Sequence, residues 1–165
     1  MSRVTRSRSR PANRGAALVA WIVGAEAAGA LSALLSRRGA WYGALSKPGW
    51  APPDWLHAPV MFLLYGALAV AGWLVWREGP AAATRRTMGL LAVLLLLAVL
   101  WGPLFFGVHR PDLAMLDLSA LWVANVLAIR IFHRIRPAAG WLLVPFLGWV
   151  TVAAALTLSI WLRNG

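Results

Sequence analysis

Long apolar stretches alternate with short polar segments along this chain. Five of the stretches are long enough to cross the roughly 30 Å of membrane hydrocarbon as helices of about 20 residues. They cover residues 16–36, 58–76, 88–107, 113–133 and 140–162. A helix satisfies its backbone hydrogen bonds internally, whereas a lone strand would leave them unpaired in lipid. The pattern therefore predicts an all-α membrane protein, a five-transmembrane-helix bundle over residues 16–165.

The first span is the weakest of the five. The second, third and fifth spans contain no Asp, Glu, Lys or Arg, but the first carries Glu26 among many Ala and Gly residues. Its basic leader also fits a signal peptide with small residues near Ala30 or Ala33 as the cleavage site. Glu26 would interrupt the apolar core of such a peptide, so a membrane span is favoured.

Composition supports the bilayer as solvent. Of the 165 residues, 61% are hydrophobic, and the mean hydropathy is +0.69, well above that of soluble domains. The chain has no Cys, which excludes disulfides, thiol chemistry and Cys-ligated metals.

The basic residues predict the orientation of the bundle. The net charge is +11, and eleven of the sixteen Lys and Arg residues fall on one side of the predicted membrane. These are Arg3, Arg6, Arg8, Arg10, Arg14, Arg77, Arg85, Arg86, Arg130, Arg134 and Arg136. The positive-inside rule then places the N-terminus in the cytoplasm of a bacterium.

The Arg-rich tail, residues 1–15, is expected to be disordered until it meets a surface. Because the charge lies in this tail and in short loops, with no soluble domain to form a groove, nucleic acid is an unsuitable partner. Anionic membrane lipids fit the charge better.

The segment between the first two spans is unusually stiff and aromatic. Residues 41–59 contain three Trp, one Tyr and four Pro. Such a segment is costly to leave mobile in water, so we expect a long structured loop that forms a fixed lid.

The motifs of common enzymes are missing from this sequence. The three His residues have no nucleophile-elbow sequence near them, and no glycine-rich phosphate loop is present. His109 and Asp112 are close in sequence, but one such pair has too few ligands for a catalytic metal and is better interpreted as helix capping. We therefore predict no catalytic residue, no metal site and no required cofactor.

Aromatic and small residues inside the bundle are better candidates for binding. Trp101 and Phe105 share a helical face beside Pro103, and Trp149 lies in the middle of the fifth span. Glu26 and Asp117 are expensive inside a membrane, so a role in ligand or proton handling is a hypothesis for both. The small residues at positions 24–30 suit either close helix packing or a flat ligand.

Taken together, these motifs resemble the TspO/MBR family, the tryptophan-rich sensory protein and translocator protein family, also called the peripheral-type benzodiazepine receptor family. The resemblance runs from about Gly24 to Asn164. It is carried by Trp41-Tyr42, Leu45, Lys47-Pro48, Trp50, Pro52-Pro53, Trp55, Pro59-Val60, Tyr65, Trp101, Phe105-Phe106-Gly107, Asp117, Leu121-Trp122, Leu142-Leu143, Pro145, Trp149, Leu156, Trp161 and Asn164.

The resemblance implies a five-helix membrane protein, usually a homodimer, whose first long loop closes over a pocket among the helices. It implies porphyrins such as protoporphyrin IX and haem, sterols such as cholesterol, and synthetic isoquinoline-carboxamide or benzodiazepine compounds as ligands. Lys47, Trp50 and His57 are then candidates for the rim of the pocket. The full set of expected ligand-binding residues is Ala30, Trp41, Lys47, Trp50, His57, Met61, Tyr65, Trp101, Phe105, Asp117, Trp122 and Trp149.

The chain departs from the family pattern at positions that matter for ligands. Met61 stands where the family often has a Trp that is associated with porphyrin contact and photochemical breakdown. Ala98 and Thr157 replace Asn residues, and His57 replaces a Phe. The sterol motif near the C-terminus lacks its Tyr between Leu156 and Arg163.

Two functional classes follow from the resemblance. The first is a membrane protein that senses, sequesters or moves porphyrin-like ligands; the second is an enzyme that degrades protoporphyrin in the light. The missing Trp at position 61 favours the first. A purely structural partner with an empty pocket, and either bacterial membrane as the location, also fit the sequence.

Overall fold

The computed structural model describes residues 11–36 and 39–164, and this part of the chain is helical with no strand. Its long helices are α1 (Pro11–Leu35), α3 (His57–Glu78), α4 (Ala81–Gly102), α5 (Pro111–Ile135) and α6 (Pro137–Asn164). Within the described ranges these five are long and apolar enough to cross a membrane, which confirms the predicted fold class. The short helix α2 (Ala40–Ala44) lies between α1 and α3.

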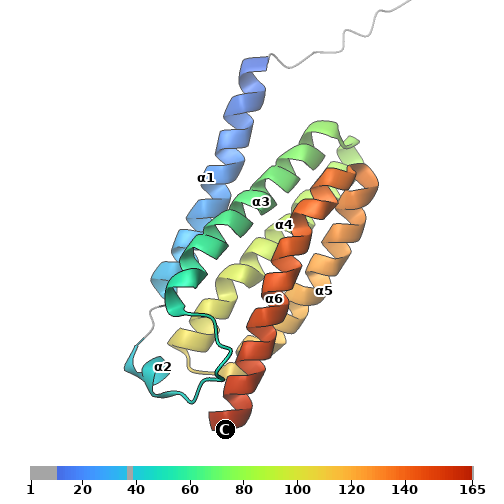
Figure 1. Cartoon of the computed structure of the whole chain (residues 1–165). Coiled ribbons are helices and arrows are strands. Elements are labelled where there is room, and N and C mark those ends of the chain that lie inside the picture. Colours follow the sequence, from blue (N-terminus) through green and yellow to red (C-terminus); the bar gives the residue numbers. More distant parts are fainter. Residues whose placement is uncertain (1–10, 37–38, 165) are drawn as a thin grey trace, which may run out of the picture.

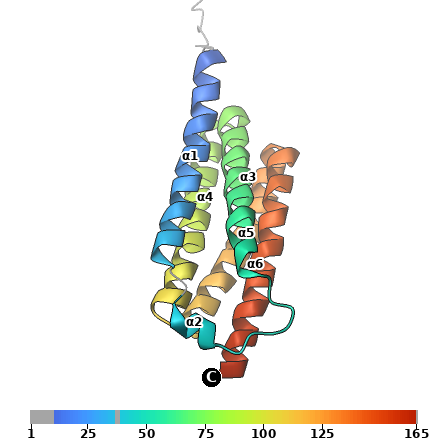
Figure 2. The ribbon, with the colours of Figure 1, turned by 60° about the vertical axis from the view of Figure 1, so that its left-hand side comes forward.

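The long helices form a closed ring in the order α1, α3, α6, α5, α4 and back to α1, and α3 also contacts α4 and α5. The pairs α5–α6 and α1–α3 make the most extensive contacts. Figures 1 and 2 show α2 and the following loop crossing the end of the bundle where the C-terminus lies. The loop therefore covers one mouth of the bundle.

Helix α1 lies at the edge of the bundle. Ala25 is the only buried residue among its described side chains. The helix begins at Pro11, which corrects the expected boundary between a disordered tail and the first helix at residue 15. Proline fits the first turn of a helix because its missing N–H has no partner there. Residues 1–10 of the expected tail lie outside the described residues.

Proline residues also set the other connections. Pro80 caps the start of α4, while Pro111 and Pro137 open α5 and α6. The α5–α6 turn is held by Arg136, which forms an ion pair with Glu78 at the end of α3. Glu78 also pairs with Arg77. This cluster joins three helix ends opposite the covered mouth, and it raises the pKa of Arg136 above its ordinary value.

One helix ends irregularly. After α4, the residues Pro103–Gly107 form a π-helical turn, in which the Val108 N–H donates to the Pro103 carbonyl at 2.9 Å. A proline at position 103 has no N–H to donate and crowds the preceding turn, which explains the wider loop. The turn places Phe105 and Phe106 in the interior.

Candidate ligand-binding site

The segment that the sequence predicted as a lid is anchored by Tyr42. This residue is buried, and its hydroxyl donates a hydrogen bond to the Asp54 carboxylate at 3.4 Å. The Lys47 ammonium lies 3.9 Å from the centre of the Tyr42 ring, a cation–π contact. Tyr42 also packs edge-on against Phe106, with ring centres 5.0 Å apart. The covering segment is thus tied to the π-helical turn below it.

A second anchor joins the loop to the end of α6. The Ser46 N–H donates to Oδ1 of Asn164 at 2.9 Å, and Nδ2 of Asn164 donates back to the Ser46 carbonyl at 3.2 Å. The same Nδ2 also donates to the Ile160 carbonyl at 2.7 Å. One side-chain amide therefore pairs with both backbone groups of Ser46.

Aromatic rings fill the space beneath this cover. Trp101 and Phe105 stack with ring centres 5.9 Å apart, which confirms their predicted shared face. Trp41 packs on the edge of Phe105 at 5.7 Å. His57 lies 5.9 Å from Trp101 and 5.8 Å from Trp149, so it stands between the indoles of α4 and α6.

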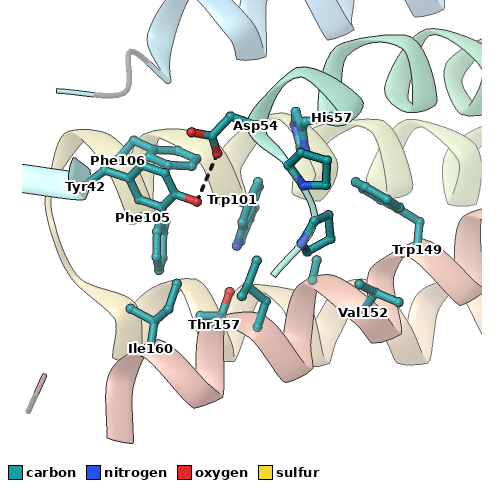
Figure 3. A pocket seen from close by; sticks show the side chains of 14 residues that line it. Tyr42, Asp54, His57, Trp101, Phe105, Phe106, Trp149, Val152, Thr157 and Ile160 are labelled. Carbon is teal, nitrogen blue, oxygen red and sulfur yellow. Dashed lines mark hydrogen bonds between the residues drawn. The ribbon is translucent and has the colours of Figure 1, made fainter. Parts of the chain in front are cut away.

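A small cavity lies under the cover. The close view in Figure 3 shows Trp101 and Trp149 on either side of it, with His57 above and Thr157 below. Phe105 lines it as well, so the structure brings together the three aromatic walls predicted from the sequence. Its free volume is only about 50 Å³. Sites for small molecules usually measure about 300–1,000 Å³, so side chains nearly fill this space.

A larger cavity adjoins it between α1 and α3. Its volume is about 680 Å³, within the range of ligand sites. Four residues line both cavities: Asp54, His57, Trp101 and Phe106. Besides His57 and Trp101, three more of the predicted binding residues line the larger one: Ala30, Met61 and Tyr65. The two spaces thus form one composite site, with His57 and Trp101 at their boundary.

Other predicted binding residues lie away from both cavities. Trp50 is 52% exposed on the covering loop, and Trp41 stacks on His109 with ring centres 4.3 Å apart. Trp122 is on the outer face of α5 and donates to the Thr151 hydroxyl at 3.1 Å. Asp117 is buried in α5 but lines neither cavity. Lys47 lines neither cavity and contacts the Tyr42 ring instead.

Sequence reasoning missed several residues of this region. Phe106 and Asp54 line both cavities, and Asn164 fixes the cover. Phe106 directly follows Phe105, so the nearby Pro103, which marked Phe105 as a candidate, could have marked Phe106 as well. Asn125, in α5, is fully buried, and neither of its amide atoms has a hydrogen-bond partner among the described residues.

His109 and Asp112 lie at the start of α5 and contact different partners. Arg110 donates two hydrogen bonds to the Asp112 carboxylate, at 2.8 and 2.6 Å, and this raises the pKa of the guanidinium. His109 stacks on Trp41. The described residues contain no group of three or more His, Asp or Glu side chains that could hold a metal ion.

These features define the class of protein: an integral, multi-pass helical membrane protein with an aromatic cavity beneath a fixed loop. The sequence model of the TspO/MBR family matches residues 16–162. The chain belongs to the TspO/MBR family.

Sequence similarity to individual proteins supports this membership. The chain is 37% identical over 147 residues to protein CrtK of Rhodobacter capsulatus, covering 87% of this chain and 90% of the relative. It is 34% identical over 126 residues to the translocator protein of Bos taurus, 75% of each chain. It is 36% identical over 125 residues to the tryptophan-rich protein TspO of Archaeoglobus fulgidus, 75% of this chain and 80% of the relative.

Proposed function

We propose that this protein binds porphyrin- or haem-type ligands, and sterol-type apolar ligands as a second group, inside its helix bundle. It would act as a sensor, a sequestering protein or a translocator. The observation that carries the proposal is the cavity of about 680 Å³ between α1 and α3, which shares His57 and Trp101 with the covered aromatic space. The name translocator protein, borne by relatives such as that of Bos taurus, favours a role in moving the ligand.

The chemistry of the walls suits a flat apolar ring. Trp101 offers an indole face, and its N–H is buried with no hydrogen-bond partner in the described structure. A porphyrin has broad apolar faces and two propionates, so it needs aromatic walls and a polar mouth. His57 lines the cavity and is the basic side chain available to a propionate, while Lys47, held over the Tyr42 ring, would need to leave that ring to reach one.

Binding is tested by titrating the purified protein in lipid nanodiscs with protoporphyrin IX while following tryptophan emission. Ala30→Phe places a large side chain in the cavity, because Ala30 lines it from α1. Ala27→Phe is the matched control, an exposed position on the same helix that lines neither cavity. We expect saturable quenching that Ala30→Phe weakens at least about tenfold, or 1.4 kcal/mol, and Ala27→Phe leaves intact. Equal binding by both variants would contradict this location.

Light-dependent degradation of protoporphyrin is the second candidate function. Trp101 at the cavity wall favours it, whereas Met61, which lines the same cavity, stands where the family often has the associated Trp. Illuminating the complex and following the porphyrin absorbance separates the two candidates. We expect a stable spectrum from the natural protein and faster loss from Met61→Trp. Turnover to a bilin-like product by the natural protein would establish the enzyme instead.

Three further properties are proposed with this function. The protein would form a homodimer, contact anionic lipids through its basic ends, and have its N-terminus in the cytoplasm. The exposed small residues on α1 suit a helix–helix interface. Cross-linking in native membranes, and protease access to the tail from each side, test the first and third of these.

A further inference from the structure

The inner end of the larger cavity contains polar groups that a porphyrin does not explain. Glu26 and Tyr65 both line this cavity, Glu26 from α1 and Tyr65 from α3. Tyr65 is only 2% exposed, and its hydroxyl has no hydrogen-bond partner among the described residues. The Oε1 atom of Glu26 is buried as well, and it also has no hydrogen-bond partner among the described residues.

Two glycines bring these side chains together. A Cβ at Gly29 of α1 would stand 2.8 Å from the Tyr65 ring, so that ring lies directly over the glycine. A Cβ at Gly66 of α3 would stand 3.6 Å from Oε1 of Glu26, so the carboxylate rests against that glycine. Each helix thus offers a glycine opposite the polar residue of the other, so both polar side chains lie at the α1–α3 contact.

The other polar side chains of α1 that line the cavity have their hydroxyl hydrogens engaged elsewhere. Ser32 and Ser36 also line the cavity, but the Ser32 hydroxyl donates to the Val99 carbonyl and the Ser36 hydroxyl donates to the Ser32 carbonyl. Their hydrogens are therefore engaged, and only lone pairs remain for a ligand. Both serines lie nearer to the covering loop, because they are six and ten positions beyond Glu26 along the chain. At the inner end the ionised Glu26 carboxylate only accepts, and the Tyr65 hydroxyl is the one side-chain donor among the described residues that line it.

An acidic group inside a membrane is costly unless a cation, a hydrogen-bond donor or water satisfies it. Among the described residues, no Lys or Arg lines the cavity. A protonated amine supplies a positive charge and up to three N–H donors at one point, enough for Glu26 and Tyr65 together. We propose that this end of the cavity binds the protonated amine of a compact apolar molecule, so that the protein prefers lipophilic amines to matched alcohols and acids. The inference rests on the proposed function, because it specifies the ligand class of the same cavity.

A second carboxylate, Asp54, lines the cavity near the covering loop. Tyr65 is eight positions from His57 on α3, so the inner end lies about 12 Å further along that helix. Asp54 is exposed, and its carboxylate accepts a hydrogen bond from the Tyr42 hydroxyl. An ion pair between an amine and this water-exposed carboxylate would add little to the binding free energy. The amine is therefore expected at Glu26 rather than at Asp54.

The test uses three probes with the same flat body: 1-pyrenemethylamine, 1-pyrenemethanol and 1-pyrenecarboxylic acid. Energy transfer from tryptophan to pyrene reports binding in nanodiscs of zwitterionic phosphatidylcholine at neutral pH. We expect the amine to bind about tenfold more tightly than the alcohol, and the acid least tightly. Glu26→Gln should bring the amine and the alcohol to equal affinity, and Tyr65→Phe should reduce amine affinity by a smaller factor. Asp112→Asn, which removes a surface carboxylate, should leave the preference unchanged.

Three outcomes would overturn the inference. They are equal binding of amine and alcohol by the natural protein, an amine preference that survives Glu26→Gln, and loss of the preference in Asp54→Asn instead. Protoporphyrin IX is titrated in parallel with every variant. Porphyrin binding without amine preference defeats only this inference, whereas absence of binding by porphyrin and all three probes defeats the proposed function as well.

Discussion

At the scale of single residues, Gly29 sets how closely α1 and α3 approach. A Cβ at this position would stand 2.8 Å from the nearest carbon of the Tyr65 ring, closer than side chains normally approach. Gly29→Ala must therefore move the ring or separate the helices. We expect a loss of about 1–3 kcal/mol in the free energy of unfolding, as for other overpacked sites. Chemical unfolding in detergent, followed by tryptophan emission, measures it.

Gly24→Ala is the matched control for this change. A Cβ there would meet nothing within 4 Å, although Gly24 is on the same helix. Because Ala favours helix over Gly by about 1 kcal/mol, this variant should be neutral or slightly more stable. Equal destabilisation by both substitutions would show that the Gly29–Tyr65 contact is not what limits the approach.

Asn164 is the residue on which closure of the loop depends most directly. Asn164→Ala removes both hydrogen bonds to the Ser46 backbone. We expect faster hydrogen exchange at the Ser46 amide and faster proteolysis between α2 and α3, with about 1 kcal/mol of local stability lost. The neighbouring Arg163→Ala serves as control, because Arg163 is exposed at the same helix end. Unchanged exchange in Asn164→Ala would mean that Tyr42 alone holds the loop.

Single residues of the site could be predicted only where a local signal existed. Trp101, Phe105 and Trp149 stood beside Pro103 or Pro145 in apolar spans, and all three line the covered cavity. Trp122 was expected only from the family resemblance, and it faces outward, since the side of a helix that meets the bundle depends on its neighbours. The pairing of Ser46 with Asn164 joins positions 118 residues apart and had no local signal.

At the scale of elements, the π-helical turn after α4 determines where the aromatic cluster lies. Pro103→Ala restores the missing N–H and should favour a regular helix through Gly107. Loss of the extra residue in this turn would rotate Phe105 and Phe106 by about 100° around the helix axis. We expect altered near-ultraviolet circular dichroism and weaker porphyrin binding.

Pro145→Ala gives the comparison for that prediction. Pro145 lies within α6, which stays α-helical around it, and its side chain is exposed. This variant should retain both the aromatic signal and porphyrin affinity. If Pro103→Ala also retains both, the π-helical turn does not shape the site.

Elements were easier to predict from the sequence than their ends. Hydropathy alone indicated five spans, because backbone groups must be satisfied within each helix in lipid. The start of α1 at Pro11 was missed because charged positions beside the membrane look disordered by composition. For the end of α4, the sequence predicted only that Pro103 would weaken the local backbone hydrogen bonds. The π-helical turn itself could not be predicted, because it depends on how Phe105 and Phe106 pack.

At the scale of the whole molecule, α1 is the outer wall of the cavity. It is the least buried of the five long helices, and the larger cavity lies between it and α3. Because the chain has no Cys, two introduced thiols can be cross-linked without competing reactions. In the double variant Ala30→Cys/Ala58→Cys, a bifunctional maleimide would link the two thiols across the cavity that both positions line. This cross-link should slow porphyrin binding. The same double variant without the linker should bind at the natural rate.

Unaltered binding after complete cross-linking would show that ligands do not pass between α1 and α3. They would then enter through the covered mouth, and Asn164→Ala should accelerate their entry instead. Comparing association rates of the two variants therefore distinguishes a lateral route from an axial one.

The most direct test of the account is the position of the ligand itself. Zinc protoporphyrin IX carries a metal whose anomalous X-ray scattering locates it in crystals of the complex. We predict one strong peak per chain in the composite cavity, beside Trp101 and His57 and between α1 and α3. A peak only on the outer surface, beside exposed indoles such as Trp122 or Trp141, would contradict the assignment of this cavity as the binding site.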